Sequence, residues 1–226
     1  MMARQLIEKT IRNFLNTVTD NDIYNEFSMQ HELGIKLREE FEKYNTANNC
    51  HFVVQFERNR TFFNINNPSN TNPNTNIPKS EIDIVVYDKN DTEDKTKWKK
   101  YAIELKYPLK SQGKEPERMY EFFEDVSFCE KLKNGGFTSA FAVVLTNNPN
   151  IYSCTSTRSL VTQYPYNHFR SSSISMPLKS EHNQNGAITK PTGEQPKIGF
   201  TIEGTYNEKW ESAQGIKNGK YYIISI

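Results

Sequence analysis

The stretch from Ser80 to Pro108 constrains the fold of this chain most. It contains two runs, SEIDIVVYD and WKKYAIELKYP, on either side of a highly charged connector. Both runs are rich in Ile, Val and Tyr, which favour β-strands, and turn-forming or charged residues bound them. The pattern predicts two neighbouring strands joined by an exposed connector.

Successive side chains of a strand point to opposite faces of the sheet. In the first strand one face therefore carries Glu81, Asp83 and Val85, and the other carries Ile82, Ile84 and Val86. In the second strand one face carries Ala102, Glu104 and Lys106, and the other carries Tyr101, Ile103, Leu105 and Tyr107. If the strands pair with their polar faces on one side, Asp83, Glu104 and Lys106 converge. Such a group is unfavourable in an apolar sheet unless it binds something, which predicts a divalent metal ion.

This pair of strands resembles the PD-(D/E)xK nuclease superfamily, which has the restriction-endonuclease-like fold. The matching residues are Asp83 and the tripeptide Glu104-Leu105-Lys106, although Ile82 stands where the nominal motif has proline. The resemblance implies a metal-dependent phosphodiesterase centre with Asp83, Glu104 and Lys106 as catalytic residues. Asp83 and Glu104 would hold Mg²⁺ or Mn²⁺ through hard oxygen ligands. Lys106 would orient the attacking water and stabilise the developing negative charge.

Two helices are predicted before these strands. Residues Arg4 to Val18 carry apolar side chains at helical spacing, and Thr19-Asp20-Asn21-Asp22 can cap a second helix that extends to about Tyr44. Steps of about 100° per residue place five apolar residues on one stripe of the second helix: Ile23, Phe27, Leu33, Leu37 and Phe41. Glu26 and Gln30 fall inside that stripe.

Glu26 is the acidic residue of this stripe that needs a partner, since a core-facing carboxylate is rarely left unpaired. In Holliday-junction-resolvase-like members of the superfamily, an N-terminal helix contributes an additional metal-binding Glu. The resemblance therefore implies Glu26 as a third metal ligand. The alternative is a half-buried Glu near the helix start, favoured by the helix dipole or paired with an arginine such as Arg60.

The following segments complete the predicted core. His51 to Arg58 is a strand, Asn64 to Pro78 is a polar loop, and a helix begins near Pro116 and ends at Asn134-Gly135-Gly136. Its buried stripe comprises Met119, Phe122, Phe123, Val126 and Cys129. The apolar run SAFAVVLTNN is typical of a parallel strand buried on both faces. The segments QHELGIKLRE and YPLKSQGKEPERMYEF also resemble a family of small bacterial proteins with this nuclease core and no established activity.

The predicted fold is α/β: a restriction-endonuclease-like core with a central mixed β-sheet flanked by helices, and a C-terminal β extension. A length of 226 residues suits a single domain. The core spans about 20–148 and the extension about 149–226. Within the extension, Ile198 to Asn207 and Tyr221 to Ile226 read as strands that extend the sheet or form a side sheet. Glu208 to Gln214 reads as a short helix.

The charge balance limits where nucleic acid can bind. A formal net charge of +1 means that any surface for nucleic acid is a local patch. Lys110 and Lys114 follow directly after the catalytic strand, so they are the candidate phosphate contacts.

Cysteine usage and hydropathy predict a cytoplasmic protein. The three cysteines have no metal-ligand spacing and fit reduced thiols better than a disulfide framework. The N-terminus lacks an apolar signal core, and no window approaches the length of a membrane span.

The predicted function is a metal-dependent nuclease that hydrolyses phosphodiester bonds, with DNA as the favoured substrate in restriction, repair or defence. A homodimer is a further expectation, because many relatives of this fold act as dimers to cut two strands. The alternative is a catalytically inactive protein of the same fold that binds nucleic acid or another protein. A third interpretation is a different α/β fold in which the carboxylates of Asp83 and Glu104 lie far apart.

Overall fold

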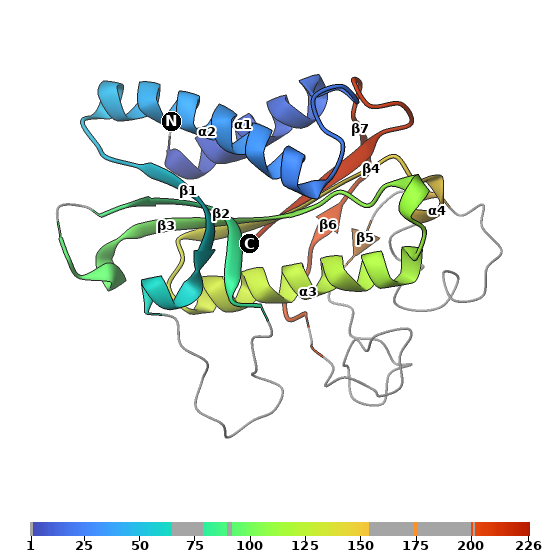
Figure 1. Cartoon of the computed structure of the whole chain (residues 1–226). Coiled ribbons are helices and arrows are strands. Elements are labelled where there is room, and N and C mark those ends of the chain that lie inside the picture. The colour runs from blue at the N-terminus through green and yellow to red at the C-terminus, as the bar shows by residue number, and fades with distance from the viewer. Residues whose placement is uncertain (1, 65–78, 90–91, 154–173, 176–199, 201) are drawn as a thin grey trace.

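The computed structural model describes residues 2–64, 79–89, 92–153, 174–175, 200 and 202–226. A mixed six-stranded sheet with helices on both faces confirms the α/β class (Figure 1). The strands, in their order across the sheet, are β1 (Val53–Asn59), β2 (Glu81–Asp88), β3 (Lys99–Lys106), β4 (Ser139–Thr146), β8 (Lys220–Ser225) and β7 (Glu211–Ser212). The long helices are α1 (Ala3–Thr17), α2 (Glu26–Asn48) and α3 (Glu115–Asn134). The short helical turns are η1 (Arg60–Phe63), η3 (Lys95–Lys97), η4 (Lys110–Gln112) and α4 (Pro149–Tyr152).

The two predicted strands lie in the middle of the sheet. β2 is antiparallel to β1 and to β3, whereas β3 is parallel to β4, and α3 makes the crossover between β3 and β4. Every residue of β4 is buried. This confirms the parallel strand buried on both faces, which needs helices above and below it.

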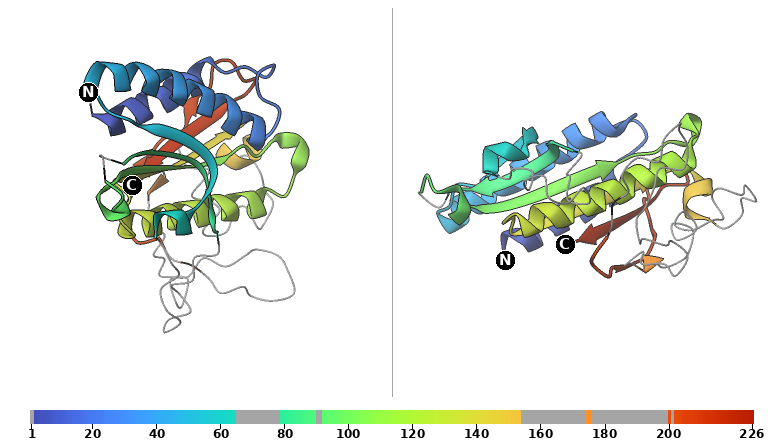
Figure 2. Two further views of the ribbon diagram at one scale, coloured as in Figure 1. Left: turned by 60° about the vertical axis from the view of Figure 1, so that its left-hand side comes forward. Right: turned by 90° about the horizontal axis from the view of Figure 1, so that it is seen from below.

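The sheet separates two apolar layers. α1 and α2 cover one face and α3 covers the other; seen from below, α3 crosses in front of the sheet with α1 and α2 behind it (Figure 2). The predicted stripe of α3 is buried in all five positions, with Phe123 and Cys129 at 0% exposure. The predicted end of this helix is also confirmed, because Gly136 has a φ of 99°, a conformation that glycine adopts without strain.

The predicted start of the second helix was wrong. The N-cap of α2 is Asn25, whose side chain accepts a hydrogen bond from the Ser28 N–H at 2.8 Å. The carboxylate of Asp22 instead accepts the Thr19 N–H at 2.9 Å and closes a separate turn before the helix. Both sites offer capping side chains, and the helix begins directly after Asn25. At its other end α2 continues past Tyr44 to Asn48.

The predicted apolar stripe of α2 is correct except at its N-terminal end. Leu33, Leu37 and Phe41 are buried, and Gln30 is buried with them. Ile23 is buried but precedes the helix, and Phe27 is 67% exposed. Phe27 lies in the first turn, about 100° around the helix from Glu26 and at the edge of the stripe, so its ring extends outward.

Gly34 allows α2 to pack closely on β1. A Cβ atom at this position would collide with the ring of Phe56. We expect Gly34→Val to lower the free energy of unfolding by about 1–3 kcal/mol, because the Phe56 ring must move to admit the side chain. Urea denaturation measures this. The control is Lys36→Val, at an exposed position of the same helix. It should lower the free energy of unfolding only by the smaller amount that follows from the low helix propensity of valine. Equal losses in the two variants would contradict close packing at Gly34.

The alternation predicted for the two central strands is confirmed in β3. Tyr101, Ile103, Leu105 and Tyr107 all belong to the layer under α1 and α2. In β2, Ile84 and Val86 belong to that layer too, but Ile82 belongs to the layer on the α3 side, so its predicted face was wrong. The pairing of β2 with β1 is interrupted at Asp83, which lies opposite Glu57, a residue with a φ of 48°. Because of this interruption, the alternation of side chains between the two faces does not continue to Ile82.

The C-terminal segment extends the sheet. β8 pairs with β4 and then with β7, which confirms a strand at Tyr221 to Ile226 and its place in the main sheet. The short helix predicted for Glu208 to Gln214 was wrong, because Glu211 and Ser212 pair with β8 across a turn. A second sheet consists of two short strands, β5 (Ile174–Ser175) and β6 (Asn207–Glu208). Of the strand predicted at Ile198 to Asn207, only the last residue, Asn207, belongs to β6.

Several predictions concern positions outside the described residues. These include most of the polar loop at 64–78, residues 198–199 and 201, and Cys154. The other two cysteines, Cys50 and Cys129, are free thiols. Among the described helices, none combines the length and the apolar character that crossing a membrane would require.

Candidate active site

Asp83 and Glu104 lie where the pairing of β2 with β3 ends. The register of these strands runs from Asp88–Lys99 to Ile84–Ile103 and stops there. Beyond that point the carboxylates take over backbone hydrogen bonds: the Leu105 N–H donates to Asp83 Oδ2 at 2.8 Å, and the Asp83 N–H donates to Glu104 Oε1 at 3.4 Å. Each acid is therefore held by the neighbouring strand.

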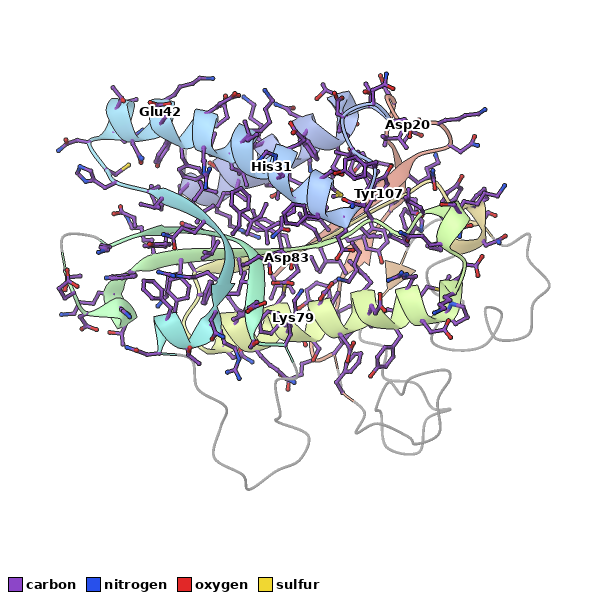
Figure 3. The ribbon with its side chains drawn as sticks, in the orientation of Figure 1. Asp20, His31, Glu42, Lys79, Asp83 and Tyr107 are labelled. Carbon is purple, nitrogen blue, oxygen red and sulfur yellow. The ribbon has the colours of Figure 1, made fainter. Side chains whose placement is uncertain are left out.

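Three carboxylates from three elements surround the ammonium group of Lys79, which precedes β2. Its Nζ lies 3.1 Å from Asp83 Oδ1 on β2 and 3.4 Å from Asp125 Oδ1 on α3, and it also contacts Glu104 Oε2 on β3. Figure 3 shows Lys79 and Asp83 between the sheet and α3. The predicted pair of acids is thus brought together around a lysine.

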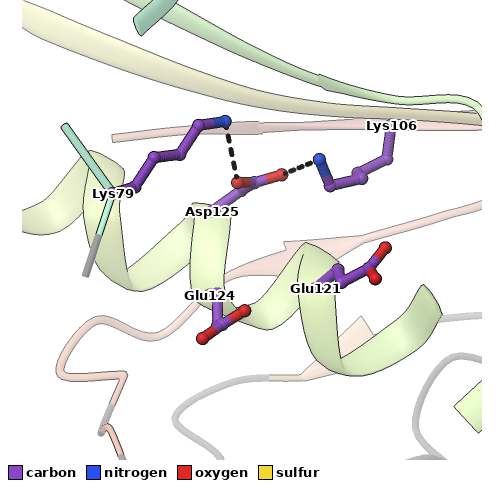
Figure 4. Close-up of a pocket in the computed structure, with 5 residues that line it drawn as sticks. All are labelled: Lys79, Lys106, Glu121, Glu124 and Asp125. Carbon is purple, nitrogen blue, oxygen red and sulfur yellow. Dashed lines mark hydrogen bonds and ion pairs between the residues drawn. The ribbon is translucent and has the colours of Figure 1, made fainter. Parts of the chain in front are cut away.

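Lys106 lies beside this group and is joined to it by Asp125. Its Nζ is 3.2 Å from Asp125 Oδ2 (Figure 4). It is also 3.1 Å from Glu26 Oε1. The other oxygen of Glu26 accepts the Tyr107 N–H at 3.2 Å. Asp125 therefore bridges two ammonium groups, and Glu26 holds Lys106 from the start of α2.

Glu104 and Asp125 are the most deeply buried members of the site. Glu104 is 0% exposed, whereas the Lys79 side chain is 29% exposed. Burial, together with the charge of Asp83, raises the pKa of Glu104, although Lys79 opposes this. Burial also raises the pKa of Asp125 to about 6, against the attraction of Lys106 and Lys79. The cluster thus favours proton uptake by these two acids.

The two lysines are stabilised in their charged forms. Burial lowers the pKa of Lys79, but the carboxylates of Glu104, Asp125 and Asp83 outweigh it and raise the pKa above its usual value. The pKa of Lys106 is likewise raised, because Asp125 and Glu26 outweigh its burial. Both side chains are therefore hydrogen-bond donors at neutral pH rather than bases.

The donor set fits a hard divalent cation. Four carboxylates face two ammonium groups here, so negative charge is in excess when all are ionised. Carboxylate oxygens are the ligands that Mg²⁺ and Mn²⁺ prefer. As the side chains stand, no group of three or more His, Cys, Asp or Glu residues in the described part of the chain is arranged to hold a metal ion. The space among the carboxylates is filled by Lys79.

Two pockets open beside Lys106, which lines both. One, of about 290 Å³, is lined by Lys79, Lys106, Glu121, Glu124 and Asp125 (Figure 4). The other, of about 250 Å³, is lined by Asn25, Glu26, Phe27, Lys106, Tyr107, Pro108, Gln112 and Arg118. A ligand in either pocket would meet the Lys106 side chain.

The structure places the remaining predicted residues as follows. Glu26 forms its ion pair with Lys106, so it contacts the predicted site through a lysine; its role as a metal ligand stays a prediction. Lys110 lies in η4 and Lys114 is the N-cap of α3; both are exposed, and neither lines the two pockets. The third interpretation required the carboxylates of Asp83 and Glu104 to lie far apart. Instead, both contact the ammonium group of Lys79.

Sequence reasoning missed Lys79 and Asp125. Asp125 had a usable signal: it follows Phe122 by three residues and precedes Cys129 by four, so helical spacing places an acid in the buried stripe of α3. Lys79 had none, because it stands between a polar run and a strand and follows no periodic pattern. Only the fold brings it to the three carboxylates.

Comparisons with family models, with curated proteins and with solved structures found no match to this chain.

Proposed function

We propose that this protein is a metal-dependent nuclease with a restriction-endonuclease-like core, and that it hydrolyses phosphodiester bonds in DNA. The observation that carries the proposal is the joint approach of Asp83 on β2 and Glu104 on β3 to one cation. Lys106 follows Glu104 by two residues on the same face of β3, with its ammonium at the border of two pockets.

Asp83 and Glu104 would hold the metal through their carboxylate oxygens. When bound, Mg²⁺ or Mn²⁺ supplies an activated water at neutral pH and offsets the charge that develops on the phosphoryl oxygens. Hydrogen bonds from the Leu105 N–H to Asp83 and from the Asp83 N–H to Glu104 orient the two acids for this task.

Lys106 would act as a cation rather than as a general base. Its raised pKa keeps the ammonium protonated, so it donates hydrogen bonds to a phosphate oxygen or to the attacking water. The ion pairs with Asp125 and Glu26 fix the direction of its side chain. Lys110 and Lys114 are exposed on the connection from β3 to α3 and would contact neighbouring phosphates without reading sequence.

The proposal is tested by cleavage of single- and double-stranded DNA and RNA by the full chain, with Mg²⁺, Mn²⁺ or a chelator. We expect metal-dependent cleavage of DNA. Lys106→Met should lower the rate about 100-fold, as loss of one donor to a developing oxyanion does. The matched control is Lys43→Met, on the far part of α2, where the lysine side chain is 71% exposed; its rate should equal that of the wild type.

The same experiment distinguishes the alternative. Binding of nucleic acid without cleavage under any metal would favour a catalytically inactive binding module on this scaffold. Cleavage that survives in Lys106→Met would remove this lysine from the mechanism.

A further inference from the structure

We propose that Lys79 is an internal cation that occupies the metal site, and that Asp125 is the third carboxylate ligand of that site. A divalent metal and the Lys79 ammonium then exclude each other. This inference rests on the metal dependence of the proposed function and adds to it a ligand and a built-in competitor.

The contacts of Lys79 are those of a bound cation. Its ammonium touches one oxygen each of Asp83, Glu104 and Asp125, which come from β2, β3 and α3. A structural salt bridge needs one such partner, and a buried pair contributes little net stability. Three converging carboxylates are the coordination expected around a hard metal ion, and here they surround an ammonium instead.

Asp125 has unused capacity that points to a ligand. Its side chain is 4% exposed and lines the pocket of about 290 Å³. Within the part of the chain that the structure describes, its Oδ2 accepts no hydrogen bond, although Lys106 Nζ lies 3.2 Å away. This oxygen is held by its ion pair with Lys106, and a carboxylate oxygen can accept a second contact, which a metal would supply.

Lys79 is placed to leave without unfolding the site. The backbone beside it is anchored, because the Arg60 N–H donates to the Ser80 carbonyl at 2.8 Å. The Lys79 side chain is 29% exposed, whereas those of Glu104 and Asp125 are 0% and 4% exposed. Rotation of the side chain alone would carry the ammonium into the adjoining pocket and leave the three carboxylates in place. The exchange replaces one positive charge by two, which suits the excess of acids.

The first test is calorimetry of Mn²⁺ binding to the full chain. If the lysine leaves the site about one-tenth of the time, Lys79→Met should bind Mn²⁺ about tenfold more tightly than the wild type. Lys79→Arg, which keeps the charge, should not bind more tightly. Lys36→Met, at an exposed lysine of α2, is the matched control and should equal the wild type. Asp125→Asn added to Lys79→Met should weaken binding about tenfold. Equal or weaker binding by Lys79→Met, or no effect of Asp125→Asn, would overturn the proposal.

Thermal denaturation shows whether these variants fold, and Mn²⁺ should raise the melting temperature of Lys79→Met more than that of the wild type. A second test needs no variant. Acetylation of Lys79 by acetic anhydride, followed by mass spectrometry, should be slow in the metal-free wild type and faster with saturating Mn²⁺. Lys36 serves as the internal reference. An unchanged rate at Lys79 with Mn²⁺ bound would contradict the exchange.

These outcomes separate the inference from the function. Cleavage by the wild type with unchanged Mn²⁺ affinity in Lys79→Met would overturn the inference and leave the nuclease intact. Tighter Mn²⁺ binding by Lys79→Met without cleavage of any substrate would overturn the nuclease and leave the inference intact.

Discussion

Replacing Glu104 by glutamine is expected to abolish Mn²⁺ binding at the site and to lower cleavage about 1,000-fold, since a metal contributes several kcal/mol to the transition state. The fold should keep its stability or gain some. Glu104 is fully buried, and both burial and the Asp83 charge disfavour its ionised form. Glutamine has nearly the same shape and carries no charge, while Lys79 retains Asp83 and Asp125 as partners.

Cleavage rates, calorimetry and thermal denaturation of Glu104→Gln test both parts of this prediction. Glu81→Gln is the matched control, because Glu81 also lies on the central pair of strands but is exposed. It should change none of the three measurements. Cleavage by Glu104→Gln at the wild-type rate would place the metal elsewhere. A loss of stability together with activity would show that the carboxylate holds the fold through Lys79.

Phe123→Ala is expected to destabilise the protein by about 3–5 kcal/mol, as truncation of a fully buried phenylalanine does. Phe123 is 0% exposed and packs between α3 and the sheet. The expected fall in melting temperature is about 10 °C, since each kcal/mol shifts a chain of this size by about 2–4 °C. Since α3 also carries Asp125, loosening this contact should weaken Mn²⁺ binding as well.

Phe27→Ala is the control for Phe123→Ala. Both remove a phenylalanine ring from a long helix, but Phe27 is 67% exposed. Its replacement should change the free energy of unfolding by no more than about 0.5 kcal/mol. Equal losses at the two positions would mean that Phe27 faces a core, as its helical spacing alone predicts.

Sequence patterns identified the elements of this fold well where one periodicity dominates. The apolar run of β4, the stripe of α3 and the alternation of β3 each have one burial pattern available to them, and each is confirmed. Patterns were less reliable where local options compete. Both Asp22 and Asn25 can cap a helix, and tertiary packing selects Asn25 for α2. Residues Glu208 to Gln214 are too few for periodicity to distinguish a helix from the hairpin strand that forms.

By itself, the sequence determined that Asp83, Glu104 and Lys106 lie on two neighbouring strands; the place of these strands in the middle of the sheet came from the structure. Alternation along a strand is a local property, so it can be read without the rest of the chain. Only the tertiary structure decided what these residues touch. Lys79 and Asp125 reach the site from outside the strand pair, and Glu26 contacts Lys106 across 80 residues of sequence. Such contacts arise from the packing of α2 and α3 on opposite faces of the sheet, and no local periodicity encodes them.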